Sequence, residues 1–109
     1  MTVSLPKAIH CYFDGSNAHD PEAIAQAFAA DAVVHDEGKV HHGRAAIAAW
    51  ARETTDKYRT TITPLAISGS GDTAAVRAKV SGTFPGSPIE LTFRFELGEV
   101  GIRALKIGS

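Results

Sequence analysis

The spacing of hydrophobic residues changes once along the chain, from every third or fourth position to strict alternation. Helical spacing holds near the N-terminus, over 21–28 and over 43–58, while alternation begins at Arg59. Turn-forming glycines and prolines divide the second part into strands, which we predict over residues 59–68, 73–84, 88–97 and 100–107. Helices followed by strands predict an α+β fold, in which a curved, mainly antiparallel sheet wraps around three N-terminal helices.

One short strand interrupts the helical part and carries most of the candidate chemistry. Ala32, Val34 and Asp36 would share one face of this strand, whereas His35 and Glu37 would point the other way. If the first face is the core, Asp36 lies at the mouth of an apolar interior. A buried carboxylate is costly, so Asp36 needs either a partner or a function.

Two local patterns predict which residues are buried in the last strand and in the first helix. In the last strand Ile102 and Ala104 fall on one face but Leu105 and Ile107 on the other, so either both faces are covered or a bulge shifts the register. Cys11 lies in a helical pattern, where we expect a small buried residue.

Composition narrows the class of protein. The 109 residues fit a single domain over 1–109, with eleven basic residues scattered among twelve acidic ones. This balance argues against a nucleic acid or an anionic membrane as partner. No apolar run is long enough to span a bilayer, and no signal-peptide pattern precedes the first helix, so we expect a cytoplasmic location. The single cysteine excludes an internal disulfide.

Three histidines raise the question of a metal site. His35, His41 and His42 lie close in sequence to Asp36 and Glu37, but neighbouring residues of a strand point to opposite faces. A zinc or iron site needs three or four converging ligands, so we predict no metal. We expect either His41 or His42 to line the pocket, with a solvated loop histidine as the alternative.

Four segments carry a resemblance to a known family: residues 20–22 (Asp-Pro-Glu), 28–36 (Phe-Ala-Ala-Asp-Ala-Val-Val-His-Asp), 43–47 (Gly-Arg-Ala-Ala-Ile) and 93–95 (Phe-Arg-Phe). With them the chain resembles the nuclear transport factor 2-like superfamily, and most of all its SnoaL-like and ketosteroid-isomerase-like members. The resemblance implies a cone-shaped α+β barrel with a deep pocket for a small apolar molecule. It also implies a homodimer formed through the sheet.

The resemblance implies roles for individual residues as well. Asp36 occupies the place of the proton-shuttling base in ketosteroid isomerases, and Tyr12 stands five residues before Asn17, as their oxyanion-binding tyrosine does. The place of their third catalytic acid is taken by Leu91. We therefore expect Asp36 as base and Tyr12 as donor to an enolate oxygen. The alternative has Asp36 capping a turn and Tyr12 as a core aromatic.

Aromatic residues would form the wall of the pocket, although aromatic side chains at such spacing also build plain cores. The residues that we expect to bind substrate are Trp50, Phe28, Tyr58, Phe84, Phe93, Phe95 and His41. The sequence thus favours an isomerase or cyclase that acts on an apolar carbonyl compound without a cofactor. The alternative is a non-catalytic ligand-binding or dimeric interaction module of the same fold.

Overall fold

A computed structural model describes residues 5–69 and 71–108 of the chain. Three helices and six strands follow one another as α1 (Lys7–Asn17), α2 (Pro21–Gln26), β1 (Phe28–Asp36), β2 (Lys39–His42), α3 (Arg44–Tyr58), β3 (Thr61–Ser68), β4 (Thr73–Ser81), β5 (Ile89–Gly98) and β6 (Gly101–Gly108). The change of hydrophobic period near residue 59 therefore marks the passage from helices to sheet.

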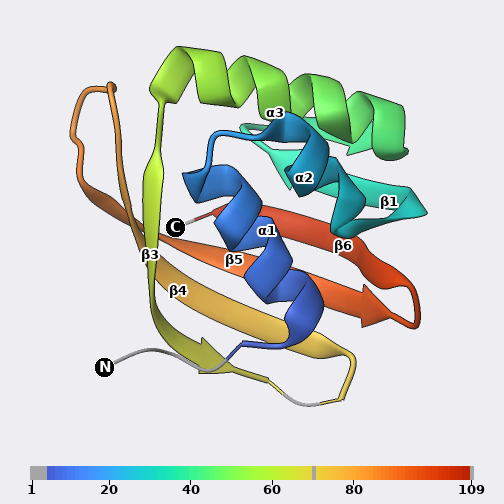
Figure 1. Cartoon of the computed structure of the whole chain (residues 1–109). Coiled ribbons are helices and arrows are strands. Elements are labelled where there is room, and N and C mark those ends of the chain that lie inside the picture. Colours follow the sequence, from blue (N-terminus) through green and yellow to red (C-terminus); the bar gives the residue numbers. More distant parts are fainter. Residues whose placement is uncertain (1–4, 70, 109) are drawn as a thin grey trace.

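The six strands form one strongly curved sheet in the order β2-β1-β6-β5-β4-β3. All neighbours run antiparallel except β1 and β6, which are parallel. The predicted α+β architecture is confirmed, with β2 and β3 as unpaired edges of an open barrel. Figure 1 shows the helices on the concave side of this sheet.

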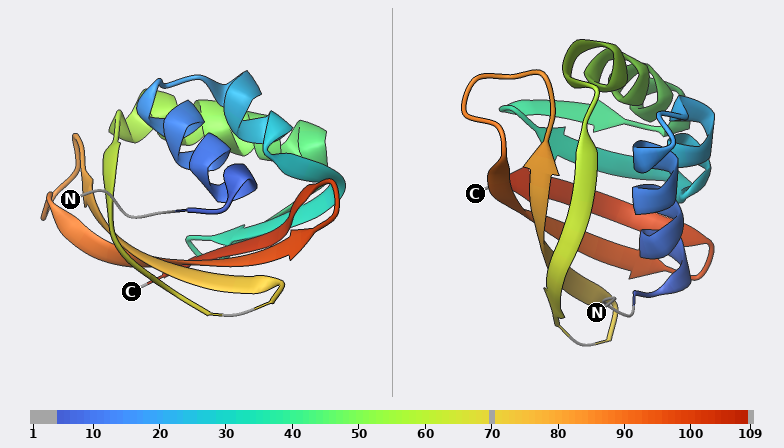
Figure 2. Two further views of the ribbon diagram at one scale, coloured as in Figure 1. Left: turned by 60° about the horizontal axis from the view of Figure 1, so that its bottom comes forward. Right: turned by 60° about the vertical axis from the view of Figure 1, so that its left-hand side comes forward.

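Helix α1 crosses the concave face and supplies one side of the core (Figure 2). Its buried residues are Ile9, Tyr12, Phe13, Gly15 and Ser16, which recur at helical spacing. The expectation that Cys11 is buried is wrong, because it lies on the opposite side of the helix and is exposed.

Helix α2 is shorter than its sequence pattern predicts. Asp20 caps it by accepting a hydrogen bond from Ala23 N, and Pro21 begins it. The helix ends at Gln26, so the prediction of a helical Phe28 is wrong. Phe28 starts β1 instead and pairs with Ile102, while Ile102 N donates to the carbonyl of Ala27. Sheet pairing thus overrides the local helical spacing.

The alternation predicted for the short strand is confirmed in β1. Ala32 and Val34 are buried, Asp36 is partly buried, and His35 is exposed. Glu37 and Gly38 make the turn to β2, and both have positive φ, at 55° and 74°. A non-glycine residue in this region is uncommon and often lies at a functional turn. The turn places Asp36 at the rim of the core.

The ambiguity in the last strand is resolved by a bulge. The pairing between β5 and β6 shifts register between Glu96 and Leu97, which face Ala104 and Ile102. Arg103 is the extra residue, so Ile102 and Leu105 can both be fully buried.

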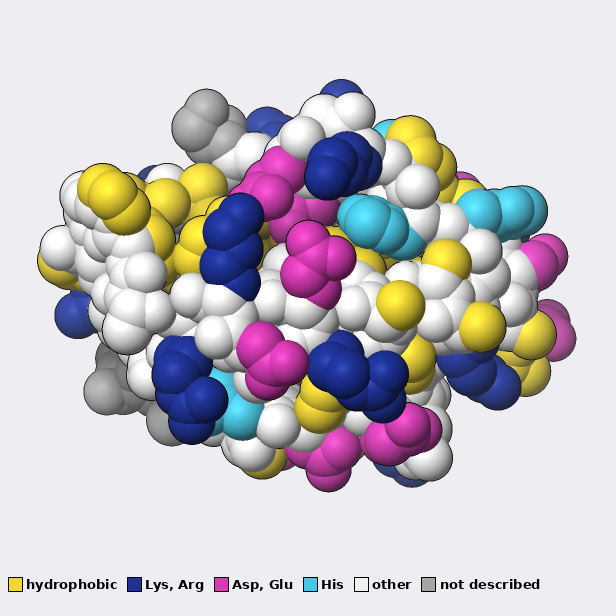
Figure 3. Space-filling model, turned by 90° about the horizontal axis from the view of Figure 1, so that it is seen from above, with side chains coloured by type: hydrophobic (Ala, Val, Ile, Leu, Met, Phe, Trp, Pro, Cys, Tyr) yellow, Lys and Arg dark blue, Asp and Glu magenta, His cyan; other side chains and the backbone are white. Residues whose placement is uncertain are grey.

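Helix α3 covers the end of the sheet formed by β1 and β2. Its inward face holds Ile47, Trp50 and Ala51, in agreement with the helical spacing of hydrophobic residues over 43–58. Seen from above, the molecule presents acidic and basic side chains side by side (Figure 3), and Arg52 lies 3.7 Å from Glu22 of α2. None of the described helices is long and apolar enough to cross a membrane.

Candidate functional site

A cavity of about 330 Å³ opens between α1, α3 and the concave face of the sheet. This volume is at the lower end of the range for small-molecule sites, so the cavity suits one small ligand. Its walls are mostly apolar. The apolar lining residues are Ile24, Ile62, Val80, Phe84, Pro85, Ile89, Leu91, Phe93 and Ile107.

Asp36 supplies a carboxylate at one end of this cavity. Its Oδ2 accepts a hydrogen bond of 3.0 Å from the indole Nε1 of Trp50. Burial raises the pKa of Asp36 above its usual value and the charge of Glu37 raises it further, while the Trp50 hydrogen bond and nearby His41 lower it. The carboxylate is therefore a stronger base than a solvated aspartate, and the Trp50 hydrogen bond orients it.

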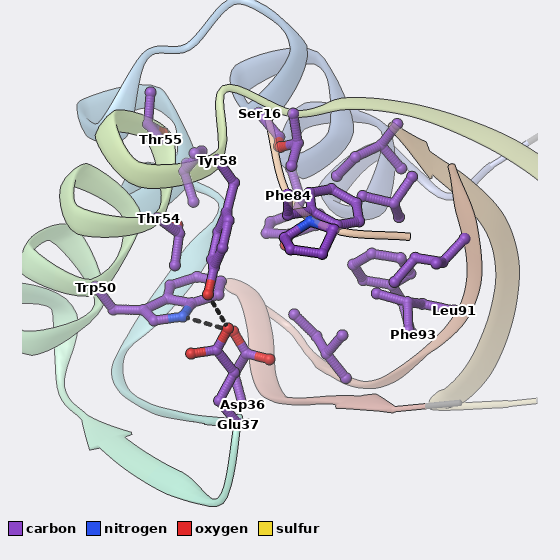
Figure 4. Close-up of a pocket in the computed structure, with 18 residues that line it drawn as sticks. Ser16, Asp36, Glu37, Trp50, Thr54, Thr55, Tyr58, Phe84, Leu91 and Phe93 are labelled. Carbon is purple, nitrogen blue, oxygen red and sulfur yellow. Dashed lines mark hydrogen bonds between the residues drawn. The ribbon is translucent and has the colours of Figure 1, made fainter. Parts of the chain in front are cut away.

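Two side chains of α3 reach down to the turn after β1. Trp50 and Tyr58 are eight positions apart, about two helical turns, so both project from the inward face of α3. The Tyr58 hydroxyl donates to Glu37 Oε1 at 2.7 Å. Figure 4 shows these two hydrogen bonds side by side, with Asp36 and Glu37 together at the same end of the cavity. Helix α3 thus fixes both carboxylates.

Tyr12 reaches the same cavity from α1. Its ring packs against Phe13, Phe28, Phe93 and Phe95, with centroid separations from 5.2 to 6.2 Å. Its hydroxyl makes no hydrogen bond with any described residue. Every fully buried side-chain oxygen among the described residues has a hydrogen-bond partner, so the Tyr12 hydroxyl is not fully buried and must open on the cavity. Burial, and secondarily the charge of Asp36, raises the pKa of Tyr12, which keeps it a neutral donor.

Asp36 and Glu37 are the only charged residues among the described residues that line the cavity. Two basic residues contact lining side chains from outside the cavity: Lys57 Nζ is 5.0 Å from the centre of the Tyr58 ring, and the ring of His41 is 6.0 Å from that of Trp50. An anionic ligand would meet two carboxylates without a compensating charge in the wall. The cavity therefore favours uncharged ligands.

The histidines singled out from the sequence do not come together. His35 and His42 are exposed, and His41 is partly buried beside Trp50. In residues 5–69 and 71–108, no three His, Cys, Asp or Glu side chains are grouped as a metal site requires.

The structure brings most of the predicted residues together. Asp36, Tyr12 and the predicted wall residues Trp50, Tyr58, Phe84 and Phe93 all line the cavity. Phe28, Phe95 and His41 do not. Phe28 and Phe95 instead contact the edges and faces of the Tyr12 ring, and His41 contacts Trp50. They support side chains that line the cavity.

Sequence reasoning missed five polar residues that line the cavity: Ser16, Glu37, Thr54, Thr55 and Thr60. Glu37 was expected to face away from Asp36, but its positive φ ends the alternation and brings its carboxylate back to the cavity. Ser16 lies one helical turn after Tyr12 on the same buried face of α1. This spacing from Tyr12 could have predicted that Ser16 also lines the cavity.

Comparison with known proteins gives one family and many similar folds. The model of the SnoaL-like domain family matches residues 9–100. A candidate polyketide cyclase from Sinorhizobium meliloti is 43% identical, with a TM-score of 0.90 and 94% of each chain covered. An epoxide hydrolase/cyclase-like enzyme of pyran ring formation in the polyether salinomycin is 26% identical, with a TM-score of 0.79, covering 94% of this chain and 87% of that one.

A protein with a ketosteroid isomerase-like fold from Catenulispora acidiphila has a TM-score of 0.87 at 19% identity, covering 97% of this chain and 87% of that one. At that identity the likeness concerns the fold alone. No curated protein sequence matches the chain.

Proposed function

Because the chain belongs to the SnoaL-like domain family, whose model matches residues 9–100, we propose that it is a cofactor-independent isomerase or cyclase. Its substrate is an uncharged, mostly apolar carbonyl compound that fills the cavity between α1, α3 and the sheet. Fold-level likeness alone does not assign an activity, which depends on the side chains of the site.

One observation carries the proposal. A single small cavity holds a partly buried carboxylate, Asp36, oriented by Trp50, together with a buried hydroxyl donor, Tyr12, that has no partner within the described chain. Abstraction of a proton next to a carbonyl requires a base at the carbon and a donor at the oxygen that becomes negative.

In the proposed reaction, Asp36 removes a proton from the carbon beside the substrate carbonyl. The electron pair of the broken C–H bond forms an enolate, whose oxygen accepts a hydrogen bond from Tyr12. In an isomerisation, Asp36 returns the proton to another carbon. In a cyclisation, the enolate carbon attacks a second carbonyl of the same molecule, and the resulting alkoxide takes the proton back from Asp36. Both outcomes balance without a cofactor.

The relatives support the choice of a ring-forming or isomerising reaction. The 43% identical relative is a candidate polyketide cyclase, and the salinomycin enzyme is cyclase-like. The lining of this cavity also restricts the charge of the substrate, since its described residues include two carboxylates and no basic side chain. We infer that the substrate enters without an anionic group.

A screen of uncharged ketones and diketones for isomerised or cyclised products tests the proposal. Wild type should form product, and Asp36→Asn should lower turnover by roughly 10²- to 10⁴-fold, since it keeps the shape but removes the base. Asp31→Asn is the matched control, because Asp31 is an exposed acid of the same strand β1. Full activity in Asp36→Asn would rule out the mechanism.

A second candidate function is binding without chemistry. Leu91 lines the cavity at the place where ketosteroid isomerases carry their third catalytic acid, so the site has one donor fewer than theirs. A ligand that binds wild type and Asp36→Asn equally well and is recovered unchanged from both would favour this function.

A further inference from the structure

Ser16 is the one buried residue with a non-aromatic polar side chain among those described, with 8% of its surface exposed. It lies on the inward face of α1, one turn after Tyr12, and lines the same cavity. Its side-chain hydroxyl makes no hydrogen bond with any described residue. Every fully buried side-chain oxygen among the described residues has a partner, so the Ser16 hydroxyl is not fully buried and faces the cavity.

The other hydroxyls of the wall differ from Ser16. Thr54 Oγ1 donates to the carbonyl of Ala51 at 3.2 Å, and the Tyr58 hydroxyl donates to Glu37. Thr55 and Thr60 are partly exposed, so water can satisfy them. A buried hydroxyl without a partner is unfavourable for folding. Among the described residues, Ser16 and Tyr12 are thus the two buried side-chain donors of the wall without a hydrogen-bond partner.

Ser16 also lies away from the proposed base. Figure 4 shows it at the opposite end of the cavity from Asp36 and Glu37, with the apolar side chains of Leu91 and Phe93 along one side. The cavity therefore has polar groups at both ends and an apolar wall along one side. A ligand that satisfies both ends needs a polar atom at each.

We propose that Ser16 binds a second hydrogen-bond acceptor of the substrate, at the end remote from the carbonyl that Asp36 and Tyr12 activate. The substrate class is then an elongated, uncharged dicarbonyl or keto-ether, with its oxygens separated by an apolar frame. This inference rests on the proposed function, because it takes the cavity as the substrate site. An ordered water on Ser16 is the competing occupant.

The test compares two ligands of similar size. One is α-tetralone carrying an acetyl group on the ring remote from its carbonyl, and the other carries an isopropyl group there, in which a methyl and a hydrogen replace the second carbonyl oxygen. Binding is followed through the indole N–H resonance of Trp50, the single tryptophan, which lines the cavity and donates to Asp36.

Wild type should bind the acetyl compound about two- to tenfold more tightly than the isopropyl compound, the range for one neutral hydrogen bond. Ser16→Ala should abolish this difference while binding the isopropyl compound as wild type does. Ser16→Cys, whose thiol is a weaker donor, should give an intermediate difference. Ser68→Ala, which removes the hydroxyl of an exposed serine outside the cavity, should bind like wild type.

Two results would overturn the inference, and they are distinguishable. If Ser16→Ala keeps the full preference for the acetyl compound, Ser16 binds only water and the proposed function stands. If neither ketone shifts the Trp50 resonance of wild type, the cavity is not a site for such carbonyl compounds, and the proposed function fails together with the inference.

Discussion

At the scale of single residues, the site depends on two polar groups whose burial opposes folding. Asp36 is a carboxylate partly removed from water, and Tyr12 is a phenol buried among rings. Each is costly to bury, and each becomes useful only when a ligand enters. Function and stability should therefore conflict at both positions.

The Tyr12→Phe variant separates the hydroxyl from the ring. Because the hydroxyl makes no hydrogen bond within the described chain, its loss should leave the melting temperature equal to or slightly above that of wild type. Turnover should fall by roughly 10²- to 10³-fold, as for the loss of one donor to an oxyanion. Unchanged turnover would show that Tyr12 is only a core aromatic.

The pH dependence of turnover should shift in opposite directions in two variants. Asp36 must be ionised to act, so activity should rise with pH through its raised pKa. Glu37→Gln removes a charge that raises this pKa and should move the rise to lower pH. Trp50→Phe removes a hydrogen bond that lowers it and should move the rise to higher pH. Profiles that stay fixed in both variants would contradict the role of Asp36.

Stability should respond to the same carboxylate. A raised folded-state pKa means that ionised Asp36 opposes folding: the cost is absent below the unfolded-state pKa and fully present above the folded-state pKa. Asp36→Asn should therefore melt at a higher temperature than wild type at neutral pH. The difference between the two melting temperatures should shrink as the pH falls towards the usual pKa range of aspartate. A difference that grows on acidification would show that ionised Asp36 does not oppose folding.

At the scale of secondary-structure elements, the sequence predicts the buried face correctly where hydrophobic residues follow a single spacing, either helical or alternating. The inward faces of α3 and β5 and the alternation of β1 follow from side-chain spacing alone. The position of Phe28 fits the apolar face of a helix as well as that of a strand. Phe28 is part of a strand because it pairs with β6. The carboxylate of Glu37 could not be placed, since a positive φ at a turn is not encoded by hydrophobic spacing.

The crossing of α1 and α2 depends on a glycine. A side chain at Gly15 would bring its Cβ to 2.9 Å from the backbone nitrogen of Ile24, so Gly15→Ala should push the helices apart and cost about 1–3 kcal/mol in the free energy of unfolding. Gly108→Ala is the control, since a Cβ there would meet no described heavy atom within 4 Å. Denaturant unfolding that ranks Gly108→Ala as the more harmful change would contradict this packing.

Helix α3 should be sensitive at Trp50. This residue is 7% exposed, lines the cavity and holds Asp36. Trp50→Ala should cost about 3–5 kcal/mol, a large part of the stability of a small domain, whereas Trp50→Phe should fold. A melting temperature of Trp50→Ala within a degree or two of wild type would show that the wall of the cavity is misplaced.

At the scale of the whole molecule, no helix or strand of residues 5–69 and 71–108 covers the convex face of the sheet. Arg94 and Lys106 stand directly opposite each other there, and neither forms an ion pair with the described residues. Like charges opposite each other are unfavourable in a sheet. We propose that a second copy of the chain covers this face and brings acidic groups to them.

Ala104 tests this homodimer. It lies on the convex face, between Glu96 and Val33 in the pairing of the strands, and is partly exposed. Ala104→Arg should leave a folded monomer, because the added side chain extends into solvent but blocks close approach of a second sheet. Light scattering at micromolar concentration should report a dimer for wild type and a monomer for the variant. A monomeric wild type would refute the proposal.

The central claim is that Asp36 removes a proton beside a carbonyl inside this cavity. The most direct measurement follows the exchange of the α-protons of a bound ketone, such as α-tetralone, for deuterium in deuterated buffer by proton NMR, which requires no knowledge of the natural substrate. Wild type and Asp31→Asn should accelerate the exchange equally, and Asp36→Asn should reduce it to the uncatalysed rate. Exchange at the wild-type rate in Asp36→Asn, or none in wild type despite bound ketone, would contradict the claim.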